Sequence, residues 1–91
     1  MLVLPAELTL QQARACLAML LQGLRAQTKS EVVADASALV RFDSSALAVL
    51  LACRRESLDG GKTFSVRGLP PKLLQLAGLY GVAGLLTEQP S

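Results

Sequence analysis

A three-residue polar segment, Asp43-Ser44-Ser45, is the part of this sequence whose side chains could do chemistry. It directly precedes an apolar run from Ala46 to Cys53. Aspartate and serine cap helix N-termini by accepting hydrogen bonds from free backbone N–H groups, and the helix dipole favours negative charge there. Two hypotheses follow: the segment is a plain helix cap, or Ser44 is a phosphorylation site that switches a contact at the start of the helix.

A catalytic role for Ser44 is not indicated by the rest of the chain. The sequence contains no histidine, so Ser44 lacks the usual general base. Neither Lys62 nor Lys72 has a spacing that indicates a serine–lysine pair, and Gly-x-Ser-x-Gly and Walker A patterns are absent. A nucleotide-binding module is the weakest alternative, because no glycine loop could cradle a phosphate. We therefore expect a protein that is not an enzyme and has no cofactor.

The apolar helix that follows Ser44 carries two stripes of side chains. The larger side chains are expected to face the core: Leu47, Leu50, Leu51 and Leu58. The adjacent stripe consists of small residues, which would permit another protein to approach closely. A phosphate on Ser44 would add about −1.5 to −2 charges at pH 7 beside that stripe and weaken the complex. The predicted partner-binding residues are Asp43, Ser44, Ser45, Ala46, Val49 and Cys53.

Composition limits the classes of function that the chain can have. Its 91 residues are enough for one domain, which we expect to span 1–91. Apolar residues make up 52% of the chain and charged residues only 18%, so part of the apolar surface is expected to face outward as a protein contact. The net charge of +2 and the aromatic content of 3% argue against nucleic-acid binding.

The two cysteines, Cys16 and Cys53, are expected to be buried free thiols. They form no C-x-x-C pair and the chain lacks histidine, which excludes the usual zinc motifs. No basic region precedes Leu2, so a signal peptide is not predicted. The longest apolar run is far shorter than the ~20 residues that span a bilayer. We expect a soluble, cytoplasmic protein.

Hydrophobic periodicity and turn residues predict alternating strands and helices. Strands are predicted at 2–4, 31–35 and 62–66, and helices at 10–26, 43–58 and 71–80, with one more turn at 82–86. Thr9 and Gln12 match a capping box before the first helix, 36–42 is predicted to be a loop, and 87–91 a tail. This β-α-β-α-β-α order predicts an α/β sandwich, with a small, mostly parallel sheet packed by three to four helices.

Three segments in this order resemble the STAS family, the anti-sigma-factor-antagonist and sulfate-transporter domain. They are Ala6-Glu-Leu-Thr9, Phe42-Asp-Ser-Ser-Ala-Leu47, and the run from Gly61 to Gly68 followed by 73–80. The resemblance covers essentially the whole chain. Within the family, the short chain and the Leu-Tyr-Gly-Val sequence at 79–82 are most similar to the small STAS subunit of Mla-type phospholipid-transport ABC complexes.

The resemblance implies a STAS-like fold and a partner surface at the loop before the second helix and the start of that helix. It implies that Ser44 occupies the place of the family's switch serine, or of the threonine found in the transporter subunit. The implied partner is an ABC ATPase; the alternative is an anti-sigma-factor antagonist whose serine kinase phosphorylates Ser44.

Two features depart from the family pattern. Ala46 stands where the family usually has glycine. The strand that ordinarily precedes the first one is missing, which leaves a bare sheet edge through which a homodimer could form.

Overall fold

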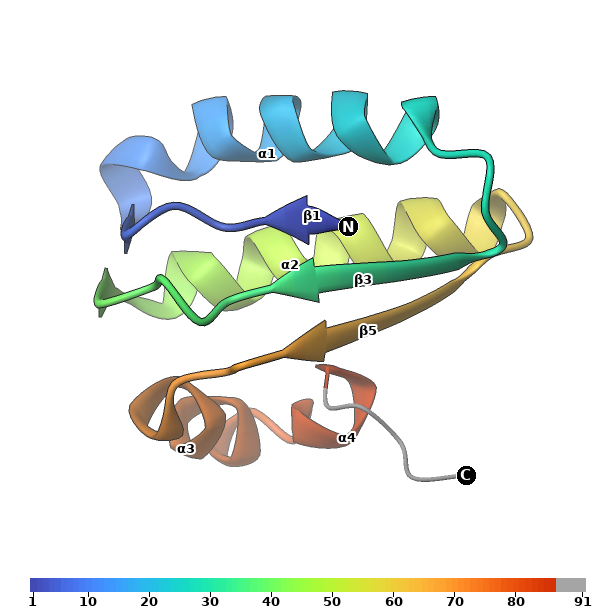
Figure 1. Ribbon diagram of the computed structural model, residues 1–91. Coiled ribbons are helices and arrows are strands. Elements are labelled where there is room, and N and C mark those ends of the chain that lie inside the picture. The colour runs from blue at the N-terminus through green and yellow to red at the C-terminus, as the bar shows by residue number, and fades with distance from the viewer. Residues whose placement is uncertain (87–91) are drawn as a thin grey trace.

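Short parallel strands and helices alternate along the chain in the computed structural model, which describes residues 1–86 (Figure 1). The predicted α/β class and the mostly parallel sheet are confirmed. The predicted tail at 87–91 lies outside the described residues. The elements are β1 (Leu2–Val3), β2 (Glu7–Leu8), α1 (Leu10–Ala26), β3 (Glu31–Asp35), β4 (Arg41–Phe42), α2 (Ser44–Asp59), β5 (Thr63–Arg67), α3 (Pro71–Leu79) and α4 (Ala83–Leu86).

The main sheet has the strand order β1-β3-β5, and both of its pairings are parallel. Parallel neighbours require a crossover connection, which α1 provides between β1 and β3 and α2 between β3 and β5. The register aligns Leu2 with Ala34 and Ala34 with Val66, and all three side chains are buried. This row faces the helical layer, in which α2 lies behind the sheet and α1 runs beside it, while α3 and α4 lie below β5 (Figure 1).

The first helix begins where the sequence predicts a cap. The Gln12 side-chain oxygen accepts hydrogen bonds from the Thr9 backbone N–H (2.9 Å) and the Thr9 hydroxyl (2.5 Å). The buried residues of α1 recur every four positions, at Cys16, Leu20 and Leu24. The spacing from one turn to the next therefore gives α1 a single apolar face that packs against α2 and the sheet.

A second, two-stranded ladder was missed in the sequence. β2 pairs in parallel with β4, aligning Glu7 with Arg41 and Leu8 with Phe42. The backbone oxygen of Ala6 accepts hydrogen bonds from the N–H groups of Val40 (2.8 Å) and of Arg41, the first residue of β4 (3.0 Å). The prediction that 36–42 is wholly a loop is therefore wrong for its last two residues. This ladder places the start of α1 beside the start of α2, because each helix follows one of its strands almost immediately.

Gly68 fixes the path of the chain that leads to β4. It follows β5 and has a φ of +70°, a conformation that residues with a Cβ rarely adopt. A Cβ at this position would lie 2.9 Å from Ser37 Cβ and 3.0 Å from Ser37 N. The turn after β5 therefore packs directly against the turn after β3, and only glycine permits that contact.

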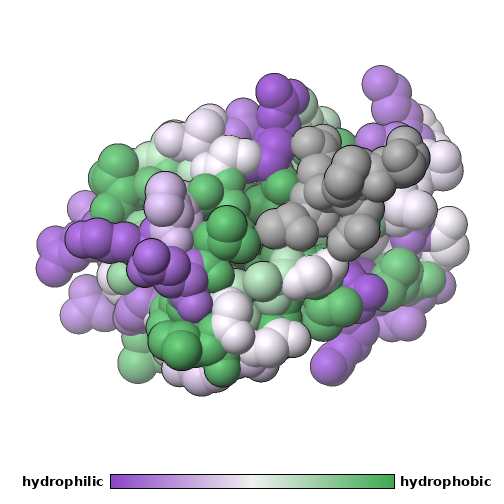
Figure 2. All heavy atoms as spheres, turned by 90° about the horizontal axis from the view of Figure 1, so that it is seen from below, coloured by the Kyte–Doolittle hydropathy of each residue, from purple (hydrophilic) through white to green (hydrophobic). Residues whose placement is uncertain are grey.

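Apolar side chains reach the surface at several places, as the composition predicts. Met1, which precedes β1, is 63% exposed, and Val3, which lies in it, is 60% exposed. β1 has a single neighbour among the described strands. The homodimer through this edge stays a prediction. The face formed by α3 and α4 also shows apolar side chains between polar ones (Figure 2). Within residues 1–86, no helix combines the length and the hydropathy needed to cross a bilayer.

Candidate functional site

One carboxylate joins the starts of two helices. Asp43 is the N-cap of α2, and its Oδ1 accepts a hydrogen bond from the Ser45 backbone N–H at 2.8 Å. Its Oδ2 accepts a second bond, at 3.1 Å, from the backbone N–H of Leu10, the first residue of α1. Each of these N–H groups lies in a first helical turn, where it has no partner within its own helix. Asp43 therefore caps both helices at once.

These two bonds also set the charge state of Asp43. They hold its pKa below the ordinary aspartate value, with the Leu10 N–H as the largest cause and the Ser45 N–H as the next. The cause is general: a donor that binds the charged form of a carboxyl favours ionisation. Asp43 is a carboxylate at neutral pH, and its negative charge sits at two positive helix ends.

Ser44 is free for contact with a partner. It is the first residue of α2 and is exposed, whereas Ser45 is half-buried. The backbone N–H of Ser45 is committed to Asp43, as is that of Ala46, which donates to the Asp43 backbone oxygen at 3.0 Å. Among residues 1–86, no side-chain hydrogen bond involves the Ser44 hydroxyl. The capping hypothesis therefore applies to Asp43, and Ser44 is not needed for it.

The stripe of small residues on α2 does not face outward, which corrects part of the predicted site. Ala46, Val49 and Cys53 are 0%, 3% and 1% exposed, and all belong to the core of the chain itself. The small side chains do permit a close approach, but the element that approaches is the chain's own: α1 packs along α2. Conversely, Leu58, which was expected to face the core, is 47% exposed.

The two thiols lie on this internal helix–helix contact. Burial raises the pKa of Cys16, and burial together with the nearby Cys16 raises the pKa of Cys53 to about 11. Both cysteines are buried and unbridged, as predicted. A thiol with a raised pKa is a poor nucleophile and behaves as a small apolar side chain.

Two exposed apolar residues were not recognised as candidates: Leu10, whose backbone N–H bonds to Asp43, and Val40, which lies three residues before Asp43. Leu10 and Val40 are each 76% exposed. Leu10 precedes the first buried turn of α1, and its backbone is bonded to Asp43. Val40 directly precedes β4, and Asp43 directly follows that strand. We call Leu10, Val40, Asp43 and Ser44 the helix-start surface.

The helix-start surface combines polar and exposed apolar side chains. It presents one hydroxyl, one fixed carboxylate and two exposed apolar side chains, and the chain has no histidine to activate the hydroxyl. In the part of the chain that the structure describes, no three histidine, cysteine, aspartate or glutamate side chains come together as metal ligands.

Comparison with known proteins identifies the family of the chain. The sequence model of the family described as "Mlab, STAS domain" matches residues 1–87. No curated protein matches the chain. The family match spans every described element, from β1 to α4.

Proposed function

Because this chain belongs to the MlaB group of the STAS domain family, we propose that it is a non-catalytic subunit that docks on the ATPase of an Mla-type phospholipid-transport ABC complex. STAS domains act in general through protein contacts and regulation, and this chain is such a domain. In the proposal the ATPase, an MlaF-like protein, binds the helix-start surface. The protein works in the cytoplasm and is held at the inner membrane by that partner.

The observation that carries the proposal is that Asp43 caps the helices, whereas Ser44 is exposed and takes no part in the capping. Asp43 holds both helix starts in place with its two oxygens, so the surface is rigid before a partner arrives. Ser44 and the exposed Leu10 are thereby presented without being needed for the fold. Rigid apolar side chains around one polar group are typical of the centre of a protein interface.

A negative charge at position 44 should affect partner binding without affecting the stability of the fold. The substitution Ser44→Glu suits the first turn of α2, because helix N-termini favour acidic side chains. In a complex, the same carboxylate would be buried beside Asp43 without a partner, which is costly. We expect Ser44→Glu to weaken ATPase binding at least tenfold with an unchanged Tm, as measured by co-purification and calorimetric titration.

Thr28→Glu is the matched control, because Thr28 is exposed and lies beyond the opposite end of α1. It should bind the ATPase as the wild type does. Equal recovery of the Ser44→Glu and wild-type chains with the ATPase contradicts the proposal.

The alternative function is an anti-sigma-factor antagonist that a serine kinase switches by phosphorylating Ser44. The exposed and unbonded hydroxyl favours it, because a kinase needs an accessible serine that can leave its place without unfolding a helix cap. Incubation with the kinase and ATP, followed by intact mass, separates the two functions. A gain of one phosphate that Ser44→Ala abolishes supports the antagonist, and no gain argues against it.

A further inference from the structure

The C-terminal half of α2 carries a partly exposed stripe, remote from Ser44. Arg54, Arg55 and Leu58 lie three, four and seven residues after Leu51, so all four lie on one side of the helix. With Val82 and Leu85 they line a groove of about 350 Å³ between α2 and the segment that contains α4. Leu58 and Leu85 are 47% and 41% exposed, so the groove has an apolar surface open to solvent.

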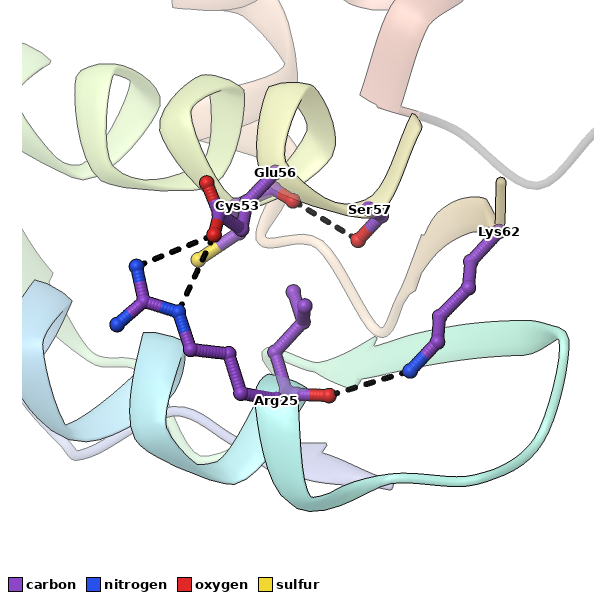
Figure 3. Close-up of polar contacts among 6 residues, drawn as sticks. Arg25, Cys53, Glu56, Ser57 and Lys62 are labelled. Atoms are coloured by element: carbon purple, nitrogen blue, oxygen red, sulfur yellow. Dashed lines mark hydrogen bonds and ion pairs between the residues drawn. The ribbon is translucent and has the colours of Figure 1, made fainter. Parts of the chain in front are cut away.

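The opposite side of this half-helix is already occupied by the chain itself. Glu56 forms an ion pair with Arg25 of α1 at 3.1 Å, and the buried Ser57 hydroxyl donates to the Cys53 backbone oxygen at 2.8 Å (Figure 3). Beyond the helix, Lys62 donates to the Gln27 backbone oxygen at 2.6 Å and ties the end of α1 to β5. The groove stripe takes part in none of these contacts.

The groove also carries an uncompensated positive charge. Arg54 and Arg55 are adjacent in sequence and both line it, whereas Asp59 is the only carboxylate that lines it among residues 1–86. The single ion pair within residues 1–86 is Arg25–Glu56, so neither of the two arginines is paired there. Two neighbouring guanidinium groups beside an apolar floor repel each other and attract an acidic ligand.

We propose that this groove binds an acidic amphipathic helix of a partner protein. The groove runs along a helix, and its leucines lie seven residues apart, the spacing at which a second helix seats apolar side chains. Glutamate or aspartate residues on the same helix then pair with Arg54 and Arg55. The inference rests on the protein-binding role proposed above and adds a second contact at the other end of α2.

The test uses the full chain and a labelled synthetic peptide, so it is independent of the ATPase. The probe is a helical peptide of about 18 residues, with leucine at intervals of three and four and glutamate elsewhere; its twin has lysine in place of glutamate. Fluorescence anisotropy should show binding of the acidic peptide only. Arg54→Glu combined with Arg55→Glu should weaken this binding at least tenfold.

Two further double variants separate the effect of the groove's charge from the effect of net charge and from that of its apolar floor. Arg14→Glu combined with Lys72→Glu makes the same change of charge at exposed sites outside the groove, and should bind like the wild type. Leu58→Ser combined with Leu85→Ser tests the apolar floor without changing charge, and should also bind at least tenfold more weakly.

The inference is overturned if the acidic peptide does not bind, or if it binds the charge-reversed groove equally well. The inference is also overturned if the protein sediments with phosphatidylglycerol vesicles and does not bind the acidic peptide. The ligand would then be an anionic lipid surface. Each of these outcomes leaves the ATPase contact of Ser44 as a separate question, which the Ser44→Glu titration answers.

Discussion

Val49→Asp should destabilise the protein more than any of the other proposed substitutions. Val49 is 3% exposed and lies in the core, where a carboxylate would have neither water nor a partner. Such a charge costs about 3–5 kcal/mol, a large part of the roughly 5–15 kcal/mol that stabilises a domain. Circular dichroism during urea unfolding should show a transition shifted to much lower urea, or no folded baseline at all.

Ala48→Asp is the matched control, because Ala48 is the neighbouring residue of α2 and is exposed. It should leave the urea midpoint nearly unchanged. The two variants together distinguish a core position of Val49 from the predicted partner contact. A residue that only contacts a partner would tolerate aspartate in the free protein. A stable Val49→Asp chain would contradict the packing of α1 on α2.

Asp43→Ala should lower the Tm by about 10 °C, because it removes the cap of two helices in one step. Asp43→Asn keeps one side-chain oxygen as an acceptor and should lose less. Thermal unfolding followed by circular dichroism measures both. Equal Tm values for the alanine variant and the wild type would mean that the two N–H groups are satisfied by water.

The stabilisation by Asp43 should also depend on pH. Its pKa is lower in the folded chain than the ordinary value of 3.8, so the stabilisation is complete above that value and is lost as pH falls through the lower, folded pKa. Hydrogen bonds from Ser37 also lower the pKa of Asp35, so acid unfolding of the wild type alone does not isolate Asp43. The Tm difference between wild type and Asp43→Ala does, and it should be constant above about pH 5 and shrink below about pH 4.

The longer elements could be predicted from the sequence because each has its own local signal. The first helix has a cap at Thr9 and an apolar repeat, and the strand at 31–35 is β-branched and ends in a polar turn; both were predicted with the bounds that the structure has. β2 and β4 were missed because Glu7-Leu8 and Arg41-Phe42 each offer one polar and one apolar residue, without the apolar run that marks β1. They exist only because residues far apart in the chain pair with each other.

The candidate site could be predicted at its polar end and not at its apolar end. Asp43 and Ser44 have side chains whose chemistry identifies a helix start, and the structure places them there. Ala46, Val49 and Cys53 were assigned to the partner because a helix that is apolar on most sides has no polar face to orient it. The packing of α1 and of the rest of the chain on α2 buries the small residues together with Leu47 and Leu50, which the sequence of the helix alone does not reveal. The two hydrogen bonds that Asp43 accepts, one from each helix, likewise depend on the β2–β4 ladder, which brings the two helix starts together.

Hydrogen–deuterium exchange of the chain, with and without an excess of the MlaF-like ATPase, tests the central claim most directly. We predict slower exchange in the complex at 40–47 and at 9–12, which contain the helix-start surface, and unchanged exchange at the turn between α1 and β3. Complex formation with protection confined to other segments, and none at 40–47, would contradict the claim that the partner binds where α2 begins.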